Sequence, residues 1–146
     1  IAKNVGAYVA TTASAKEAEY VKLLGADEVI DNESQDFSAL LKDYDAVFDT
    51  VGGETNAKSY AVLKDGSAFV SMGDPANEEL VTAHEIKYFQ QSSQPTVERL
   101  TRIAELVDTG KLKVNVDKTF TLDQAAEALE YLKTGHPRGK VVLKIK

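Results

Sequence analysis

Short apolar runs alternate with amphipathic stretches along the first half of the chain. The runs cover residues 7–12, 28–31, 45–50 and 67–72, and a turn at Asp65 and Gly66 precedes the last of them. Runs that are apolar at nearly every position are typical of strands covered on both faces. Strands that alternate with helices predict a parallel sheet. We therefore expect an α/β fold with a doubly wound parallel sheet and helices on both faces.

The helices between these runs carry start and stop signals. Ser14 and Glu17 have the spacing of a capping box, in which the Ser14 hydroxyl bonds a free helix amide, and Gly25 should end this helix. A brief amphipathic stretch covers residues 37–42, and a further helix is expected over residues 54–63.

The second half continues the alternation. Polar and apolar residues alternate over residues 86–90, as in an edge strand, and again over residues 112–116. Helical periodicity predicts helices over residues 97–110 and 121–135, the second of which begins with a capping box. Residues 140–145 are expected to form a last strand. No repeat, linker or low-complexity tract interrupts the pattern. The sequence thus predicts one domain.

Charge and composition exclude several classes of function. The 146 residues include 17 basic and 23 acidic side chains, a net charge of −6, and no cysteine. An acidic chain lacks the positive surface that nucleic acid or anionic lipid requires. The absence of cysteine excludes disulfides, iron–sulfur clusters, thiolate zinc sites and a cysteine nucleophile. No apolar run is long enough to span a membrane and no signal peptide opens the chain, so we expect a cytoplasmic location.

Small and polar residues follow four of the predicted strands. They are Thr11–Ser14, Asp31–Asn32, Thr50–Gly53 and Ser71–Gly73. Ligands of open parallel sheets bind at the carboxyl ends of the strands, where glycine permits close approach and free helix amides favour anions. One such turn simply connects a strand to a helix, but four at the same edge predict a ligand site.

Several sequence blocks, in order, resemble a known superfamily. AYVATTAS, KLLGADEVIDN, DAVFDTVGG and FVSMG are followed by IAELVDTGKLKVNVDKTFTL, AAEALEYL and TGHPRGKVVLKI. This order resembles the medium-chain dehydrogenase/reductase superfamily, above all its quinone oxidoreductase-like branch, often labelled zinc-type alcohol dehydrogenase-like. The resemblance implies a Rossmann-like NAD(P)-binding domain over residues 1–146. It also implies an NADPH-dependent oxidoreductase that transfers hydride to a quinone, an enone or another activated carbonyl compound.

The resemblance leaves one structural gap. The family's preceding strand, its glycine-rich phosphate turn and its N-terminal catalytic domain have no counterpart, and residues 1–6 read as the end of a helix. That strand lies at the centre of the doubly wound sheet. Without it, the Tyr8 and Val47 strands would flank an empty slot of about 5 Å on each side. We expect a truncated chain, or a strand supplied from upstream or by another chain.

The end of the first strand bears on the choice of dinucleotide. NAD-dependent enzymes usually carry an acidic residue there for the ribose 2′-hydroxyl. Thr12 and Ser14 occupy this region, and no acid appears before Glu17. Ser14 and Lys16 can serve a 2′-phosphate, although Ser14 can also be a plain helix cap and Lys16 a solvated side chain. We therefore expect NADP(H) rather than NAD(H), as the resemblance also implies.

The predicted cofactor contacts extend over the other turns. Thr50, Val51 and Gly52 should line the pocket floor, with Met72 and Gly73 at the nicotinamide-ribose side. The resemblance adds Lys140, near the pyrophosphate. The full predicted set is Thr12, Ser14, Lys16, Asn32, Thr50, Val51, Gly52, Met72, Gly73 and Lys140. No catalytic residue is assigned.

Other patterns carry little weight. Tyr60 and Lys64 share the spacing of a short-chain dehydrogenase pair, but that spacing arises easily by chance. His84 and His136 lack partners for a metal site, so we expect no metal in this stretch.

Two alternatives to the oxidoreductase stay open. One is a Rossmann module for another adenosyl ligand, such as S-adenosylmethionine, although the acidic residue that would favour it is absent. The other is a non-catalytic module for dimerisation through the edge strand at Ile86–Gln90, which could also make an enzyme a homodimer.

Overall fold

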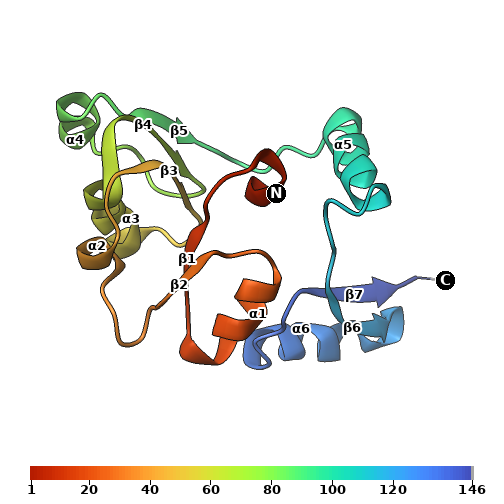
Figure 1. Cartoon of the computed structure of the whole chain (residues 1–146). Coiled ribbons are helices and arrows are strands. Elements are labelled where there is room, and N and C mark those ends of the chain that lie inside the picture. The colour runs from red at the N-terminus through yellow and green to blue at the C-terminus, as the bar shows by residue number, and fades with distance from the viewer. Residues whose placement is uncertain (146) are drawn as a thin grey trace. The chain divides into compact units, whose positions relative to one another are not determined.

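The computed structural model describes residues 1–145 (Figure 1). The chain divides into two compact units, one formed by residues 2–94 and the other by residues 95–145 with Ile1. No helix among the described residues is long and apolar enough to cross a membrane.

Two parallel sheets form the 2–94 unit. β1 (Ala10–Ala13) pairs with β2 (Glu28–Asp31), and β3 (Tyr44–Asp49), β4 (Leu63–Ser71) and β5 (Lys87–Gln90) form a second sheet in that order. Because all three pairings are parallel, the carboxyl ends within each sheet lie at the same edge. The predicted parallel α/β architecture is confirmed.

Short helices connect the strands of this unit. They are η1 (Ala2–Val5), η2 (Ala15–Glu17), α1 (Ala18–Leu23), α2 (Phe37–Leu40), α3 (Gly53–Ser59), η3 (Tyr60–Val62) and α4 (Glu78–Ala83).

Two hydrophobic clusters hold the unit together. Ile30, Leu41 and Val62 form the first, with β1 and β3 residues packed around it. Tyr60, Phe69 and Ile86 form the second. Because the first cluster takes residues from both sheets, the sheets share a core although no strand pairing joins them.

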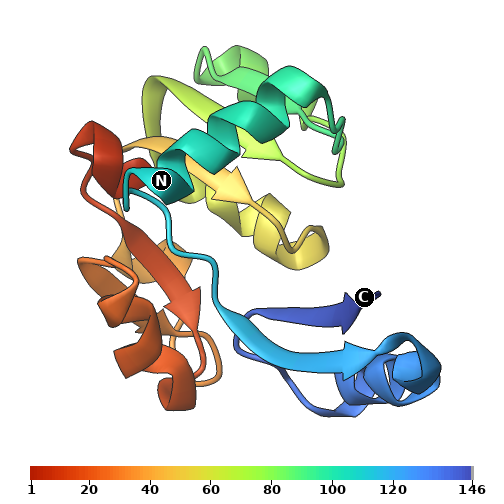
Figure 2. The same ribbon diagram turned by 90° about the vertical axis from the view of Figure 1, so that its right-hand side faces the viewer.

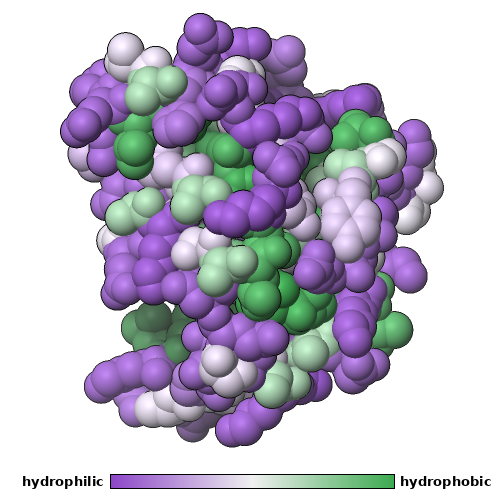
Figure 3. All heavy atoms as spheres, turned by 60° about the vertical axis from the view of Figure 1, so that its left-hand side comes forward, coloured by the Kyte–Doolittle hydropathy of each residue, from purple (hydrophilic) through white to green (hydrophobic). Residues whose placement is uncertain are grey.

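A slot separates β1 from β3. Each strand pairs with only one other strand among residues 1–145, so each has a free edge. A cavity of about 770 Å³ is lined from both sides, by residues 7–11 and residues 42–48. Apolar side chains stay exposed here: 62% of Tyr8 and 66% of Phe48 are accessible. Exposed hydrophobic residues are not confined to one place, since Figure 3 shows several hydrophobic patches among hydrophilic side chains on the face that it presents. The cavity lies where the sequence predicts an empty slot.

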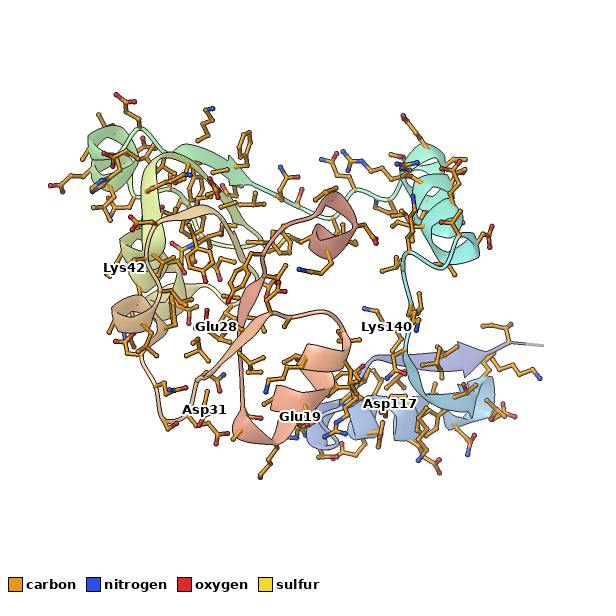
Figure 4. The ribbon with its side chains drawn as sticks, viewed as in Figure 1. Glu19, Glu28, Asp31, Lys42, Asp117 and Lys140 are labelled. Atoms are coloured by element: carbon orange, nitrogen blue, oxygen red, sulfur yellow. The ribbon has the colours of Figure 1, made fainter. Side chains whose placement is uncertain are left out.

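A shared carboxylate lies near the amino-terminal end of this slot. The hydroxyls of Tyr8 and Tyr44 both donate to Glu28 Oε2, at 3.3 and 3.4 Å. Glu28 is the first residue of β2 (Figure 4). This arrangement links the segment before β1 to the start of β3 without filling the space between them.

Three local predictions for this unit are wrong. β1 begins at Ala10, three residues later than expected. Ser14 makes no side-chain cap hydrogen bond; the helix opens with a 3-10 turn, in which the Glu17 amide donates to Ser14 O at 2.9 Å instead of to the hydroxyl. Gly66 lies inside β4 rather than before it, in an irregular stretch where its amide donates to His84 O.

The second unit contains one parallel strand pair. Its elements are α5 (Val97–Asp108), β6 (Val116–Thr121), η4 (Leu122–Gln124), α6 (Ala125–Thr134) and β7 (Lys140–Lys144). Figure 2 shows β6 beside β7, with α6 along the pair. The rings of Phe120 and Tyr131 lie 5.9 Å apart between strand and helix.

The boundaries of this unit only partly match the sequence. The capping box is present, with Thr121 N–H donating to Gln124 Oε1 at 3.1 Å. The predicted strand over residues 112–116 is wrong, because pairing begins where Val116 meets Lys140. Polar and apolar residues also alternate before Val116, but β7 offers no partner residues there.

Candidate functional site

The carboxyl ends of β1 and β3 open on a common cavity of about 240 Å³. Thr11 and Thr12 line it from β1, and Asp49, Thr50 and Val51 line it from the end of β3. The structure therefore brings together Thr12, Thr50 and Val51, which the sequence predicts as ligand contacts.

The turn after β3 is built around the Asp49 carboxylate, which is only 4% exposed. Its Oδ1 accepts the amide hydrogens of Val51 at 2.9 Å and Gly52 at 3.0 Å. Its Oδ2 accepts from Asn56 Nδ2 at 2.8 Å. Hydrogen bonds to an ionised acceptor are strong, so this carboxylate fixes the turn from the inside.

The turn after β4 is built around the Ser71 hydroxyl, which is fully buried. Ser71 Oγ accepts from the amides of Gly73 at 3.3 Å and Asp74 at 3.1 Å. Asn56 Nδ2 reaches the same oxygen at 3.4 Å. One asparagine thus bridges the two turns.

Gly52 and Asp74 form a second link between these turns. The Gly53 amide donates to Asp74 Oδ2. Gly52 has a φ of +82°, and a Cβ atom there would lie 2.8 Å from the same oxygen. Only glycine combines this backbone conformation with so close an approach.

The end of β5 supports the turn after β4. Gln90 Nε2 donates to Gly73 O at 2.9 Å, and Tyr88 hydroxyl donates to Asp74 O at 2.7 Å. These contacts fix the carbonyl groups of a turn whose amides are already engaged.

The turns after β1 and β2 lie side by side. The Asn32 amide donates to Ala13 O at 3.1 Å. Asp31, at the end of β2 (Figure 4), accepts from the Glu33 amide at 3.1 Å and from the Ser34 hydroxyl. The structure therefore places a carboxylate close to Ser14, a residue predicted to serve a phosphate.

The predicted residues fall into two groups. Nine of them lie in the 2–94 unit, at the carboxyl ends of its strands or on the segments that follow them: Thr12, Ser14, Lys16, Asn32, Thr50, Val51, Gly52, Met72 and Gly73. Lys140 is the first residue of β7, in the other unit, where its amide donates to Asn115 O at 2.8 Å. Its role near a pyrophosphate stays a prediction.

One expectation about these turns is wrong. The amides of Val51, Gly52, Gly53 and Gly73 are not free for an anion, because Asp49, Asp74 and Ser71 accept their hydrogens. Sequence reasoning also missed Asn56. The spacing of residues could have indicated it. Asn56 lies one helical turn after Gly52, on the first helix after a strand that ends in aspartate, so its side chain can reach that aspartate.

Tyr60 belongs to the core instead of a catalytic pair. Its side chain is 6% exposed, its ring centre lies 4.7 Å from that of Phe69, and its oxygen accepts from the Asn77 amide at 3.0 Å. Lys64 pairs with Asp45.

Hydrogen bonds lower the pKa of several carboxyl groups. Burial raises the pKa of Asp49, but the Gly52, Val51 and Asn56 donors outweigh it, so the pKa lies below the ordinary 3.8. The Lys3 ammonium lowers the pKa of Asp27, and hydroxyl donors lower those of Asp31 and Asp36.

Acid should therefore destabilise the 2–94 unit. A carboxyl group with a lowered folded-state pKa contributes stability above its unfolded pKa and loses it as the pH falls through the folded one. We expect the melting temperature to fall steadily below about pH 4. Thermal denaturation followed by circular dichroism checks this; a melting temperature that stays constant from about pH 5 to pH 3 would contradict it.

Comparisons with known proteins agree on the family. A family model described as zinc-binding dehydrogenase matches residues 24–143. The NADPH-dependent alkenal/one oxidoreductase of Arabidopsis thaliana chloroplasts is 33% identical over 98% of this chain and 36% of its own length. The mitochondrial NAD(P)H oxidoreductase RTN4IP1 of Bos taurus is 31% identical over 99% of this chain and 43% of its own length.

A solved structure also matches. The quinone oxidoreductase from Coxiella burnetii is 33% identical, with a TM-score of 0.85 over 99% of this chain and 47% of that one. The chain spans less than half the length of each of these three proteins. Since the family model covers most of its residues, the chain belongs to the zinc-binding dehydrogenase family.

Proposed function

We propose that this chain forms most of the dinucleotide-binding part of an oxidoreductase that transfers hydride from NADPH to a quinone, an enone or another activated carbonyl compound. One observation carries the proposal. Turns rich in small residues lie at the carboxyl ends of parallel strands, where such sheets bind dinucleotides, and one cavity is lined by the end of β1 and by the turn after β3. The relatives named as alkenal/one and quinone oxidoreductases support the substrate class.

The chemistry of the turns suggests how the dinucleotide is oriented. The amides after β3 and β4 are engaged, and the carboxylates of Asp49 and Asp74 lie among them. Such turns disfavour a phosphate and suit a neutral group with hydroxyl or amide donors. We place the nicotinamide and its ribose near Thr50, Val51 and Met72, and the phosphates nearer the turn after β1. The cofactor supplies the hydride chemistry, and these residues bind and orient it.

The preference for NADPH depends on Ser14 and Lys16 in this proposal. Ser14 has no capping bond, and Lys16 is exposed within η2. The nearby Asp31 carboxylate opposes a phosphate, so the lysine charge should matter.

Lys16→Ala in the intact protein should raise the Kd of NADPH about tenfold and change that of NADH little, because only NADPH carries the 2′-phosphate. Lys22→Ala is the matched control, since Lys22 is an exposed lysine paired with Glu19 on the adjoining α1. Fluorescence titration with both dinucleotides measures the effect. Equal losses for NADPH and NADH would remove Lys16 from the site.

Turnover tests the reaction itself. The intact protein should consume NADPH when given a quinone or a conjugated enone. Consumption of neither, together with saturable binding of S-adenosylmethionine, would favour the rival adenosyl module.

The residues present do not fit a zinc site. No three His, Asp or Glu side chains come together among residues 1–145, the chain has no cysteine, and a protein zinc site needs at least three ligands. No step of the proposed reaction is assigned to a metal.

A homodimer through β5 is part of the proposal. β5 is an outer strand of its sheet, with no second partner among the described residues, and Phe89 on it is 48% exposed. An unpaired edge can add a second copy across a two-fold axis. Sedimentation of the intact protein and its Phe89→Lys variant tests this; a wild-type monomer would overturn it.

A further inference from the structure

We propose that Asp49 is a positioning residue of the dinucleotide site, which acts through Asn56 and Ser71 to hold the turns after β3 and β4 as one rigid unit. This inference rests on the proposed function. Asp49 itself faces inward and touches no ligand in this proposal. Its effect on binding passes through Val51, Gly52 and Gly73.

The Asp49 carboxylate accepts hydrogen bonds from donors inside the turn after β3. An ionised carboxylate only accepts hydrogen bonds, at about four lone-pair sites. Two amides and the Asn56 side chain fill three of these for Asp49. With the carboxylate almost fully buried, water cannot replace these donors easily.

Asn56 connects this turn to the turn after β4. Asn56 is 6% exposed and donates to Asp49 while lying 3.4 Å from Ser71 Oγ, which in turn accepts two amides. The Met72 amide also donates to Asp49 O at 3.0 Å. Movement of either turn therefore breaks bonds in the other.

The network also lies directly beneath the candidate ligand contacts. Asp49 lines the cavity at the carboxyl edge together with Thr50 and Val51, and Asn56 and Ser71 are buried beside it. A buried polar network in this place fits preorganisation of a binding site.

An exchange of side chains between two positions tests the inference in the intact protein. Asn56→Asp places two buried carboxylates at a hydrogen-bonding distance of 2.8 Å, so one must take a proton or move away. The double variant Asp49→Asn with Asn56→Asp restores a donor opposite an acceptor. In it, the new side-chain amide at position 49 would still accept the two backbone amides through its oxygen and would donate to the new carboxylate at position 56.

We expect Asn56→Asp to raise the Kd of NADPH about tenfold or more at neutral pH, with partial recovery at lower pH as one carboxyl group takes up a proton. The double variant should return to within about threefold of the wild type. Ile86→Ala is the control for lost stability, because Ile86 is buried in the second cluster, which contains no residue of either turn. It should lower the melting temperature and leave the Kd unchanged.

Three outcomes decide the matter. An Asn56→Asp variant that is destabilised like Ile86→Ala but binds NADPH normally would overturn the positioning role and leave the proposed function intact. A double variant as weak as the single one would overturn it also. If the wild type does not bind NADPH, the proposed function fails, and hydrogen exchange of the Val51 and Gly52 amides in the same variants still shows whether Asp49 holds the turn.

Discussion

Replacement of Phe69 by alanine should lower the free energy of unfolding of the 2–94 unit by about 3–5 kcal/mol. Phe69 is fully buried in β4, and its ring centre lies 4.7 Å from that of Tyr60 and 5.2 Å from that of Tyr88. Truncation removes the buried ring and leaves a cavity between two tyrosines whose hydroxyls hold neighbouring loops. A loss of this size is a large fraction of the stability of a small domain.

Urea denaturation followed by circular dichroism measures this loss. Leu40→Ala is the control, because Leu40 belongs to the same unit and is 54% exposed on α2. It should cost less than about 1 kcal/mol. Equal losses for the two variants would show that Phe69 is not the centre of the core.

Filling the slot between β1 and β3 should have the second large effect. We propose that the slot takes one extended apolar strand, parallel to both neighbours. Both edges are free among the described residues, the carboxyl ends of β1 and β3 line the same cavity, and apolar side chains line the space between the two strands. A strand there would satisfy two rows of backbone groups and cover Phe48.

A synthetic strand tests this on the 146-residue chain. A valine-rich peptide with a charged solubilising tail should raise the melting temperature. At a peptide concentration about 100 times its Kd, the stabilisation is about 2.7 kcal/mol. Amides at the free edges of β1 and β3 should become protected from hydrogen exchange.

The matched control is the same peptide with a central proline, which cannot donate to the ladder. Protection by the proline peptide to the same extent would mean that simple hydrophobic adsorption explains the effect. Protection confined to other elements would show that the slot does not accept a strand.

The strands were predictable because their apolar runs are strong and local. β2 and β3 lie within one residue of the predicted ranges, and the gap beside β1 follows from the order of strands in a doubly wound sheet. The ends of strands that depend on where the neighbouring strand ends were not predictable. Residues 112–115 alternate as a strand does, yet strand pairing begins only at Val116, because β7 begins at Lys140, its partner.

The turns of the candidate site were predictable in position but not in their hydrogen bonding. Glycines at the ends of strands indicated the turns correctly. The sequence did not show that Asp49 and Ser71 take up the amides of those turns, since such contacts depend on how two loops meet in space. For the same reason Ser14 has the spacing of a cap but no capping bond, because the Glu17 amide bonds the Ser14 carbonyl oxygen instead.

The most direct test of the central claim is a fluorescence titration of NADPH with the intact protein. We expect saturable binding of NADPH that NADP⁺ displaces, with a lower Kd than that for NADH. A signal that rises linearly with protein concentration, without saturation or displacement, would contradict it.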